Sequence, residues 1–314
     1  MSKLLTFKQK FNRWLDKYDN MPKSMRKGKY GFVFLMAFPA LAGLAVFYFY
    51  VNFNSILLAF KDARTNEYSL INFQQLFAEF KSSDTVIVQA LKNTLYFFIL
   101  GSFITPVIGY FVAYFFYKKI PLGSVFRFIL FVPGIISGIV VSTLFIKMVS
   151  PAGPISYWKF LLTGTPLVDY LHQDDTSIWM ILAFCLWTGF TSNVLLLMGT
   201  FSRLPSEVLE SARLDGATPM QELFLIITPM VWSTISTLFM LSMTGLFTSS
   251  GPILLFTNGA YNTYTLSFWI FAQVKDSAIY NYPSAVGLFF TIIGLPIVIG
   301  VYKLMGKVQA NVEF

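Results

Sequence analysis

Few residues in this 314-residue sequence could perform catalytic chemistry, since it holds one cysteine, Cys185, and one histidine, His172. These counts exclude disulfide frameworks and zinc sites built from cysteine and histidine, and we expect no metal site. The sequence also lacks the G-x-x-x-x-G-K-[ST] loop that cradles nucleotide phosphates. It therefore predicts a chain that is not an enzyme and that hydrolyses no nucleotide by itself.

Small polar residues inside apolar stretches form a second group of candidates. Ser233, Thr237, Thr244 and Thr248 share one helical face, which favours close packing between helices in lipid and could instead line a translocation pathway. An amide in the membrane, such as Asn193, is costly unless it is paired or faces a wet cavity. We predict a substrate pathway bordered by Trp187, Thr191, Asn193, Thr237, Thr244 and Thr248.

The segment 204–222 reads LPSEVLESARLDGATPMQE and predicts two short helices. Ser206 is the expected N-cap of a first helix over 207–215, which Gly216 ends by adopting a left-handed conformation. Thr218 and Gln221 form a capping box that starts a second helix, with Pro219 at its first position. Pro229 is expected to kink that second helix further along.

The helix over 207–215 is too short to be stable by itself in water. Val208, Leu209 and Ala212 give it an apolar face beside Glu210 and Arg213, which lie close enough to pair with each other. Such a face needs a partner. The alternatives are the lipid surface, the rest of this chain or a second protein.

The composition indicates a membrane protein, because 55% of residues are hydrophobic, only 12% are charged and the mean hydropathy is +0.63. About 20 apolar residues in a helix are needed to cross a bilayer. Charge-free stretches predict six spans, and the charge-poor segment that follows the fifth is expected to re-enter the protein. The six predicted spans cover 31–51, 93–117, 128–146, 177–202, 228–250 and 277–302.

Basic residues predict the orientation. Residues 1–30 carry nine Lys or Arg, and Lys118, Lys119, Arg127, Lys303 and Lys307 fall at the same side if the chain crosses six times. This places both termini in the cytoplasm, and it explains the formal charge of +8 without nucleic acid. The loop 201–222 goes against the rule with two Arg and four acids, so the number of crossings alone places it inside.

The segment 210–229 resembles the EAA loop of binding-protein-dependent ABC importer permeases, which reads Glu-Ala-Ala, three residues, Gly, nine residues and Ile-x-Leu-Pro. Glu210, Ala212, Gly216, Ile226 and Pro229 match in register, whereas Ser211 and Thr228 depart. The resemblance covers most of the chain and is to the first subunit of maltose or multiple-sugar permeases. Further matching stretches are Asn93-Thr94, Phe126-Arg127, Pro133, Ser137, Ser150-Pro-Ala-Gly153 and Leu214-Asp-Gly-Ala217, while Gly259-Ala-Tyr261 departs from Gly-Gly-Pro.

This resemblance implies an all-helical type I ABC importer permease in the bacterial cytoplasmic membrane. Its domains would be a basic segment 1–30, a permease domain 31–305 with the coupling loop 203–225, and a tail 306–314. The coupling helix would dock on a separate ATPase subunit through Glu207, Val208, Leu209, Glu210, Ala212, Arg213, Asp215 and Gly216.

The implied partners are a second homologous permease subunit, two ATPase subunits that bind ATP and Mg, an external solute-binding protein, membrane lipid and a sugar. The chain would hold no cofactor of its own. Three alternatives stay open: a permease for polyols such as glycerol phosphate, a channel or facilitator that needs no nucleotide, and a membrane enzyme. The enzyme is disfavoured because the spans contain no cluster of acid, histidine or cysteine residues.

Overall fold

The computed structural model describes residues 23–82, 85–118, 121–277 and 279–312. This part of the chain is almost entirely helical and contains one isolated β-bridge, between Lys61 and Tyr68. The chain forms two compact units, Met1–Leu58 and Ala59–Phe314. The expected domain boundary at residue 30 therefore falls within the first helix, α2 (Lys23–Gly43), and residues 1–22 lie outside the described part.

The first unit holds a long apolar helix. Helix α2 continues through a π-helical segment (Leu44–Tyr50) into α3 (Val51–Ala59). The stretch Gly31–Ala59 has 29 residues and is longer than the predicted span 31–51. In its most apolar part, no residue is buried within the protein. A helix of this length exceeds the bilayer core of about 30 Å, so lipid is the expected surrounding of its side chains.

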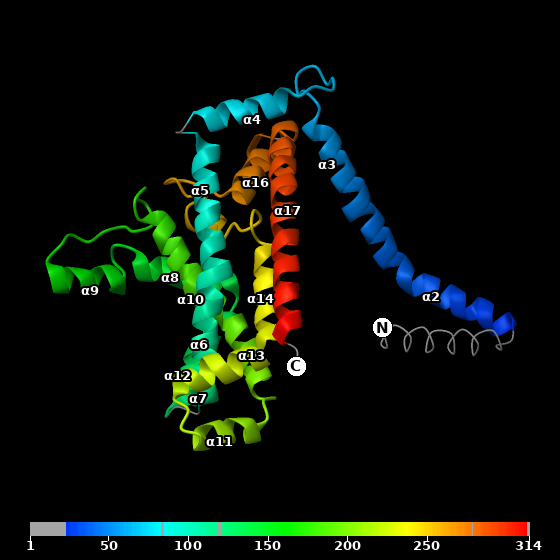
Figure 1. The fold of residues 1–314 in the computed structure, drawn as a ribbon. Coiled ribbons are helices and arrows are strands. Elements are labelled where there is room, and N and C mark those ends of the chain that lie inside the picture. The colour runs from blue at the N-terminus through cyan, green and yellow to red at the C-terminus, as the bar shows by residue number, and fades with distance from the viewer. Residues whose placement is uncertain (1–22, 83–84, 119–120, 278, 313–314) are drawn as a thin grey trace. The chain divides into compact units, whose positions relative to one another are not determined.

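In the second unit, long helices run side by side, and Figure 1 shows α5 and α6 as one column next to α10, α14 and α17. Five helices of the described chain are long and apolar enough to cross a membrane, or six if a bent pair counts as one span. This confirms the predicted all-helical membrane fold. The bounds are α4 (Ile71–Lys81), α5 (Val86–Ile99), α6 (Thr105–Tyr117), α10 (Ser177–Phe201), α14 (Trp232–Met243) and α17 (Asn281–Val312).

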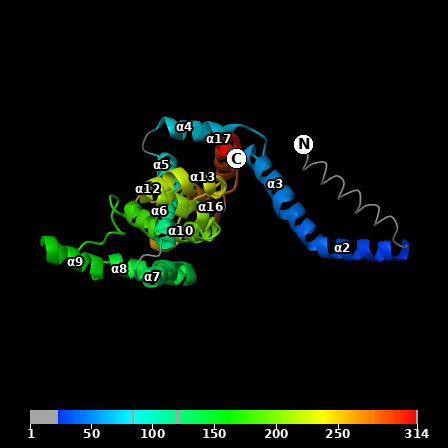
Figure 2. The same cartoon turned by 60° about the horizontal axis from the view of Figure 1, so that its bottom comes forward.

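Helices α6 and α10 lie side by side in both ribbon views and pack closely against each other (Figure 2). A Cβ atom added at Gly109 would lie 2.9 Å from the Cβ of Asn193, so only glycine permits this approach. Ala113, Val194 and Phe201 are buried in the same contact. A glycine in α6 thus fixes the distance between two central helices.

The predicted third span is wrong as a single helix. Residues 128–146 are divided between α7 (Gly123–Ile135) and α8 (Gly138–Val149), and α9 (Pro154–Thr163) follows. Ile136 and Ser137 are extended, with ψ of 149° and 132°. Pro133 removes a backbone donor near the end of α7, and Gly138 begins α8, so the local sequence weakens helical continuity where the break occurs.

The predicted fifth span, 228–250, is also not one helix. The helical stretch Pro219–Met230, which includes α12 (Pro219–Gln221), a π-helical segment (Glu222–Ile227) and α13 (Thr228–Met230), meets α14 at an angle of 75°. The bend lies at Val231, two residues after Pro229, so the expected kink is present. Helix α14 ends at Met243, and turns replace the expected helix up to Ser250.

The charge-poor segment after α14 re-enters the protein as expected. Ile253 and Phe256 of α15 (Ile253–Phe256) are buried, and α16 (Leu266–Ser277) leads on to α17. The buried Asn93 of α5 holds this segment, because its amide donates to the carbonyls of Asn262 at 2.6 Å and Tyr264 at 2.8 Å. Next to it, the hydroxyl of Thr94 accepts from the backbone N–H of Leu266 at 2.9 Å.

We expect Asn93→Ala to lower the free energy of unfolding by about 1–3 kcal/mol, because two carbonyl groups in the interior lose their donor. Asn52→Ala, which removes an exposed amide from α3, is the matched control and should change stability little. Thermal unfolding of the purified chain in detergent, followed by circular dichroism, measures both. Equal midpoints for the two variants would show that Asn93 does not hold the re-entrant segment.

Candidate functional site

The segment with the strongest sequence signals forms a short helix at one end of the second unit, α11 (Ser206–Leu214). It begins one residue earlier than predicted, because Pro205 rather than Ser206 occupies the N-cap and no side chain caps the helix there. Gly216 has the expected left-handed conformation, with φ of 82°. The capping box between Thr218 and Gln221 is present, with the Thr218 N–H 2.9 Å from the Gln221 side-chain oxygen.

The apolar side of α11 packs on this chain itself. Leu209 and Ala212 are buried, and Leu209 belongs to the core cluster that contains Phe201, Leu223 and Ile227. Val208, the third residue of the predicted apolar face, is exposed. Of the three partners considered for this face, the rest of this chain covers Leu209 and Ala212, so these two predicted docking residues are buried at the end of the bundle.

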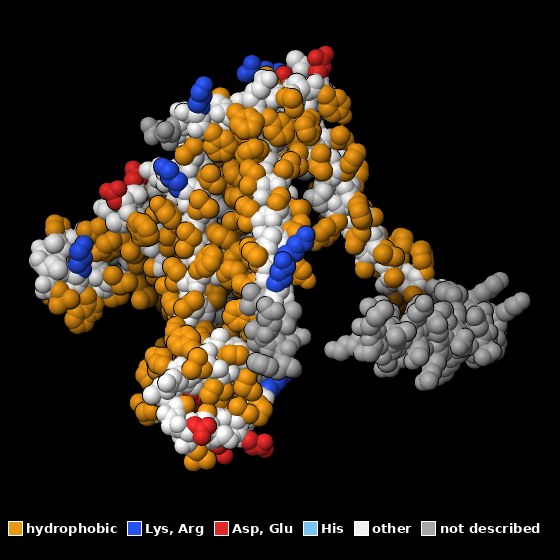
Figure 3. Space-filling model, viewed as in Figure 1, with side chains coloured by type: hydrophobic (Ala, Val, Ile, Leu, Met, Phe, Trp, Pro, Cys, Tyr) orange, Lys and Arg blue, Asp and Glu red, His pale blue; other side chains and the backbone are white. Residues whose placement is uncertain are grey.

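The opposite side of α11 carries charged groups and one large apolar side chain. Glu207, Glu210 and Asp215 are exposed, and acidic side chains gather over α11 in Figure 3. Leu214 is 90% exposed at the C-terminal end of the helix. Helix α11 thus exposes acidic groups and Leu214 on its outer side, while its inner side packs on the bundle.

Arg213 forms an ion pair that sequence spacing did not suggest. Its Nε lies 3.4 Å from Oε2 of Glu222, so the pair expected within α11, with Glu210, is replaced by a pair with the next helix. The same oxygen accepts from Lys118 Nζ at 2.6 Å. Sequence analysis missed this site because Lys118 lies 104 residues from Glu222. The one available signal was an excess of acids in a loop expected to be basic.

Two tyrosines of α6 join it to the same region. The Tyr114 hydroxyl donates to the carbonyl of Pro219 at 2.9 Å, and the Tyr110 hydroxyl lies 2.7 Å from that of Thr228. These bonds satisfy polar groups around the π-helical segment at the start of the bent span. Helix α6, α11 and the segment 219–230 are therefore linked by side-chain contacts.

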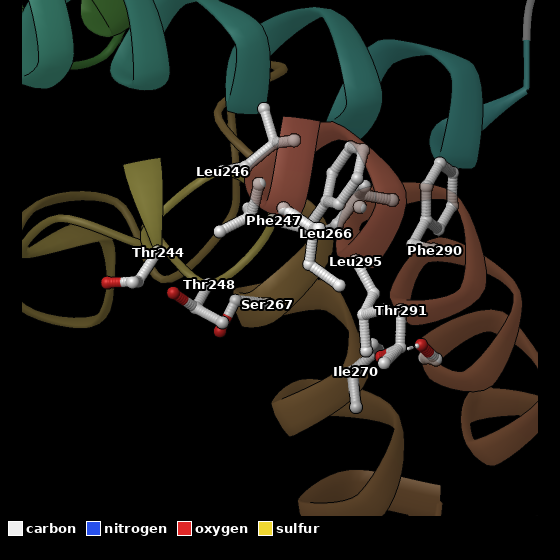
Figure 4. Close-up of a pocket in the computed structure, with 14 residues that line it drawn as sticks. Thr244, Leu246, Phe247, Thr248, Leu266, Ser267, Ile270, Phe290, Thr291 and Leu295 are labelled. Carbon is white, nitrogen blue, oxygen red and sulfur yellow. Dashed lines mark hydrogen bonds between the residues drawn. The ribbon is translucent and has the colours of Figure 1, made fainter. Parts of the chain in front are cut away.

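The predicted pathway residues lie in two places. Thr244 and Thr248 line a cavity of about 440 Å³ together with Ser267 and Thr291, two hydroxyl residues that sequence analysis missed. Figure 4 shows Thr244, Thr248 and Ser267 grouped on one side of this cavity. Thr244 and Thr291 donate their hydroxyls to carbonyls of their own helical turns, at 2.7 Å each. The Thr248 and Ser267 hydroxyls bond no other described residue, so they are available to a ligand.

The other predicted pathway residues do not line this cavity. Trp187 packs against Phe145 and Phe184, the hydroxyl of Thr191 donates to the Leu130 carbonyl at 3.1 Å, and that of Thr237 donates to the Ser233 carbonyl. Asn193 lies in the contact with α6. The cavity's aromatic side is formed by Phe247 and Phe290, whose ring centroids are 4.9 Å apart. Within the described residues, no group of three or more His, Cys, Asp or Glu could hold a metal ion.

The sequence matches the family model described as "Binding-protein-dependent transport system inner membrane component" over residues 105–311, more than half of the chain. It is 26% identical to the probable ABC transporter permease protein MG188 of Mycoplasma genitalium, over 84% of each chain. It is also 26% identical to the multiple sugar-binding transport system permease protein MsmF of Streptococcus mutans, over 87% of this chain and 90% of that protein.

Among solved structures, the fold is similar to a chain of a bacterial alginate ABC transporter in complex with an alginate pentasaccharide-bound periplasmic protein. The TM-score is 0.78 at 19% sequence identity, covering 90% of this chain and 96% of that chain. At this identity the likeness supports the fold alone. It agrees with the helical membrane architecture described above.

We expect Gly216→Ala to lower the free energy of unfolding by about 1 kcal/mol, because an alanine Cβ is strained in the left-handed region. No atom lies within 4 Å of the added Cβ at Gly216 or at Gly199, so Gly199→Ala, near the C-terminal end of α10, is the matched control. The control should be neutral or stabilising. Denaturant unfolding of both variants measures the difference, and a Gly216→Ala chain as stable as the control would contradict the assigned strain.

Proposed function

Because this chain belongs to the family of inner membrane components of binding-protein-dependent transport systems, we propose that it is a permease subunit of an ATP-driven sugar importer. Separate ATPase subunits would supply the energy through α11. Accumulating a neutral solute 10,000-fold costs about 5.5 kcal/mol, and this sequence contains no nucleotide-binding loop to supply it. The energy must then come from a partner.

The observation that carries this proposal is the two-sided placement of α11. Its inner side is buried on the bundle through Leu209 and Ala212, while Glu207, Glu210 and Leu214 on the outer side are exposed. A docked ATPase subunit would cover the outer side. Closure of two such subunits would then displace α11 and switch the bundle between inward-facing and outward-facing states.

The cavity beside Thr248 supports a neutral, hydroxyl-rich substrate. Its lining holds four hydroxyl residues and two phenylalanine rings and no charged residue. Sugars combine hydroxyl edges with apolar faces, which these groups match. A phosphorylated polyol would need a cation here, so the lining favours an uncharged sugar over glycerol phosphate. The multiple sugar-binding system of the relative from Streptococcus mutans points the same way.

The remaining partners follow from the family. A second permease subunit and an external solute-binding protein would complete the importer in the bacterial cytoplasmic membrane, with both termini and α11 in the cytoplasm. The family description names binding-protein-dependent transport, which supports the external receptor. A channel or facilitator would need no ATPase and is an outcome of the first test below.

We expect Leu214→Glu to abolish co-purification of the ATPase subunits while the chain stays folded, because a charge replaces the most exposed apolar group of α11. Leu70→Glu, an exposed leucine at the start of α4, is the control and should leave the complex intact. If no ATPase co-purifies with the unaltered chain and uptake proceeds without nucleotide, the chain is a facilitator and the proposal fails.

We expect Thr248→Val and Ser267→Ala each to lower sugar uptake by about tenfold, because each removes one ligand hydrogen bond of about 1.4 kcal/mol. Thr143→Val, which removes a hydroxyl that donates to its own helix, is the control. Uptake of neutral mono- and oligosaccharides and of glycerol 3-phosphate into proteoliposomes holding the full transporter measures the effect. Unchanged uptake, or uptake of glycerol 3-phosphate alone, would contradict a sugar site at this cavity.

A further inference from the structure

Glu222 is a buried carboxylate where three parts of the chain meet. It is 1% exposed and begins the π-helical segment of the bent span. Its Oε2 accepts from Lys118, which directly follows α6, and from Arg213 of α11. A charge withdrawn from water this far is costly unless it is paired, so the two cations stabilise it.

The position of Glu222 separates it from the residues that identify the coupling loop. It lies among the nine unspecified residues between Gly216 and Ile226, so the EAA pattern does not require an acidic residue at this position. The acids at 207, 210 and 215 are exposed, whereas Glu222 points inward. Its contacts within this chain therefore indicate its role.

Helices α6 and α11 are attached to the segment 219–230 by different kinds of contact. Helix α6 holds the segment 219–230 by neutral bonds from Tyr110 and Tyr114 in addition to the Lys118 pair. For α11, the Arg213–Glu222 pair is the side-chain hydrogen bond that joins it to the bent span within the described chain. The rest of its attachment is the apolar contact of Leu209 and Ala212, which has no fixed direction.

The second carboxylate oxygen of Glu222 offers Arg213 another acceptor if α11 moves. Oε1 of Glu222 is buried and bonds no group within the described residues. The Arg213 side chain is 52% exposed and carries five N–H donors. Its guanidinium can thus shift from one oxygen to both as α11 moves, without breaking the ion pair.

We propose that Glu222 is a positioning residue that fixes α11 and the end of α6 to the start of the bent span, so that a displacement of α11 is passed to the membrane helices. This inference rests on the proposed function, since it assigns how that displacement is transmitted. Glu222 is buried, away from the exposed side of α11, and does not line the cavity beside Thr248. A purely structural residue would affect folding, whereas a positioning residue affects the ratio of uptake to ATP hydrolysis.

The test compares Glu222→Gln and Arg213→Gln in the full transporter reconstituted in proteoliposomes. Both variants are expected to assemble and hydrolyse ATP while sugar uptake per ATP falls by about fivefold or more. Arg213→Lys should recover part of the ratio because it restores a cation. Glu67→Gln and Arg64→Gln, exposed residues of the loop before α4, are the controls and should leave the ratio unchanged. If Glu222→Gln fails to fold, Arg213→Gln decides, since its side chain is half exposed.

A distance measurement on the full chain separates the two proposals. With Cys185→Ser as background, spin labels at positions 211 and 115 report the distance between α11 and α6. We expect one narrow distribution in the unaltered chain and a broader one in Glu222→Gln. If no ATPase co-purifies, the proposed function fails, yet this measurement still reports whether Glu222 holds α11. An unchanged uptake ratio, or an unchanged distribution, overturns the inference.

Discussion

A nine-residue helix cannot keep its shape alone in water, so α11 depends on the apolar contact that Leu209 and Ala212 make with the end of the bundle. Burying one leucine contributes about 2 kcal/mol, and an apolar contact of this kind sets no direction for a movement of the helix. Direction comes from the ion pair of Arg213 with Glu222. The outer side of α11, with Glu207, Glu210 and Leu214, is exposed in this chain.

The membrane imposes the second constraint, since backbone groups in lipid must find partners within the protein. The chain breaks its helices at Ile136 and at Val231, and it returns a short segment after α14 into the core. Two of these irregular parts have polar side chains beside them. Asn93 and Thr94 bond the re-entrant segment, and Tyr110 and Tyr114 bond the helical segment before Val231.

Local signals predicted the local structure. Gly216 and the Thr218–Gln221 capping box were expected from sequence, and α11 and α10 fall within one residue of the predicted bounds, because these features depend on neighbours in the chain. The break at Ile136 was not predicted, although Pro133 and Gly138 lie beside it, and only the packed structure shows that this chain covers Leu209. Glu222 illustrates the limit best: it counted as a loop acid against the expected orientation, yet in the fold it is neutralised by Lys118 and Arg213.

We propose that α11 is fixed to this chain on one side and covered by an ATPase subunit on the other. Single cysteines at 214 and at 209, in a Cys185→Ser background, test it by their rates of maleimide labelling in membranes with and without the ATPase subunits. Position 214 should label rapidly in the chain alone and slowly in the assembly, and position 209 slowly in both. Equal labelling of position 214 in both preparations, or rapid labelling of position 209 in the chain alone, would contradict the account.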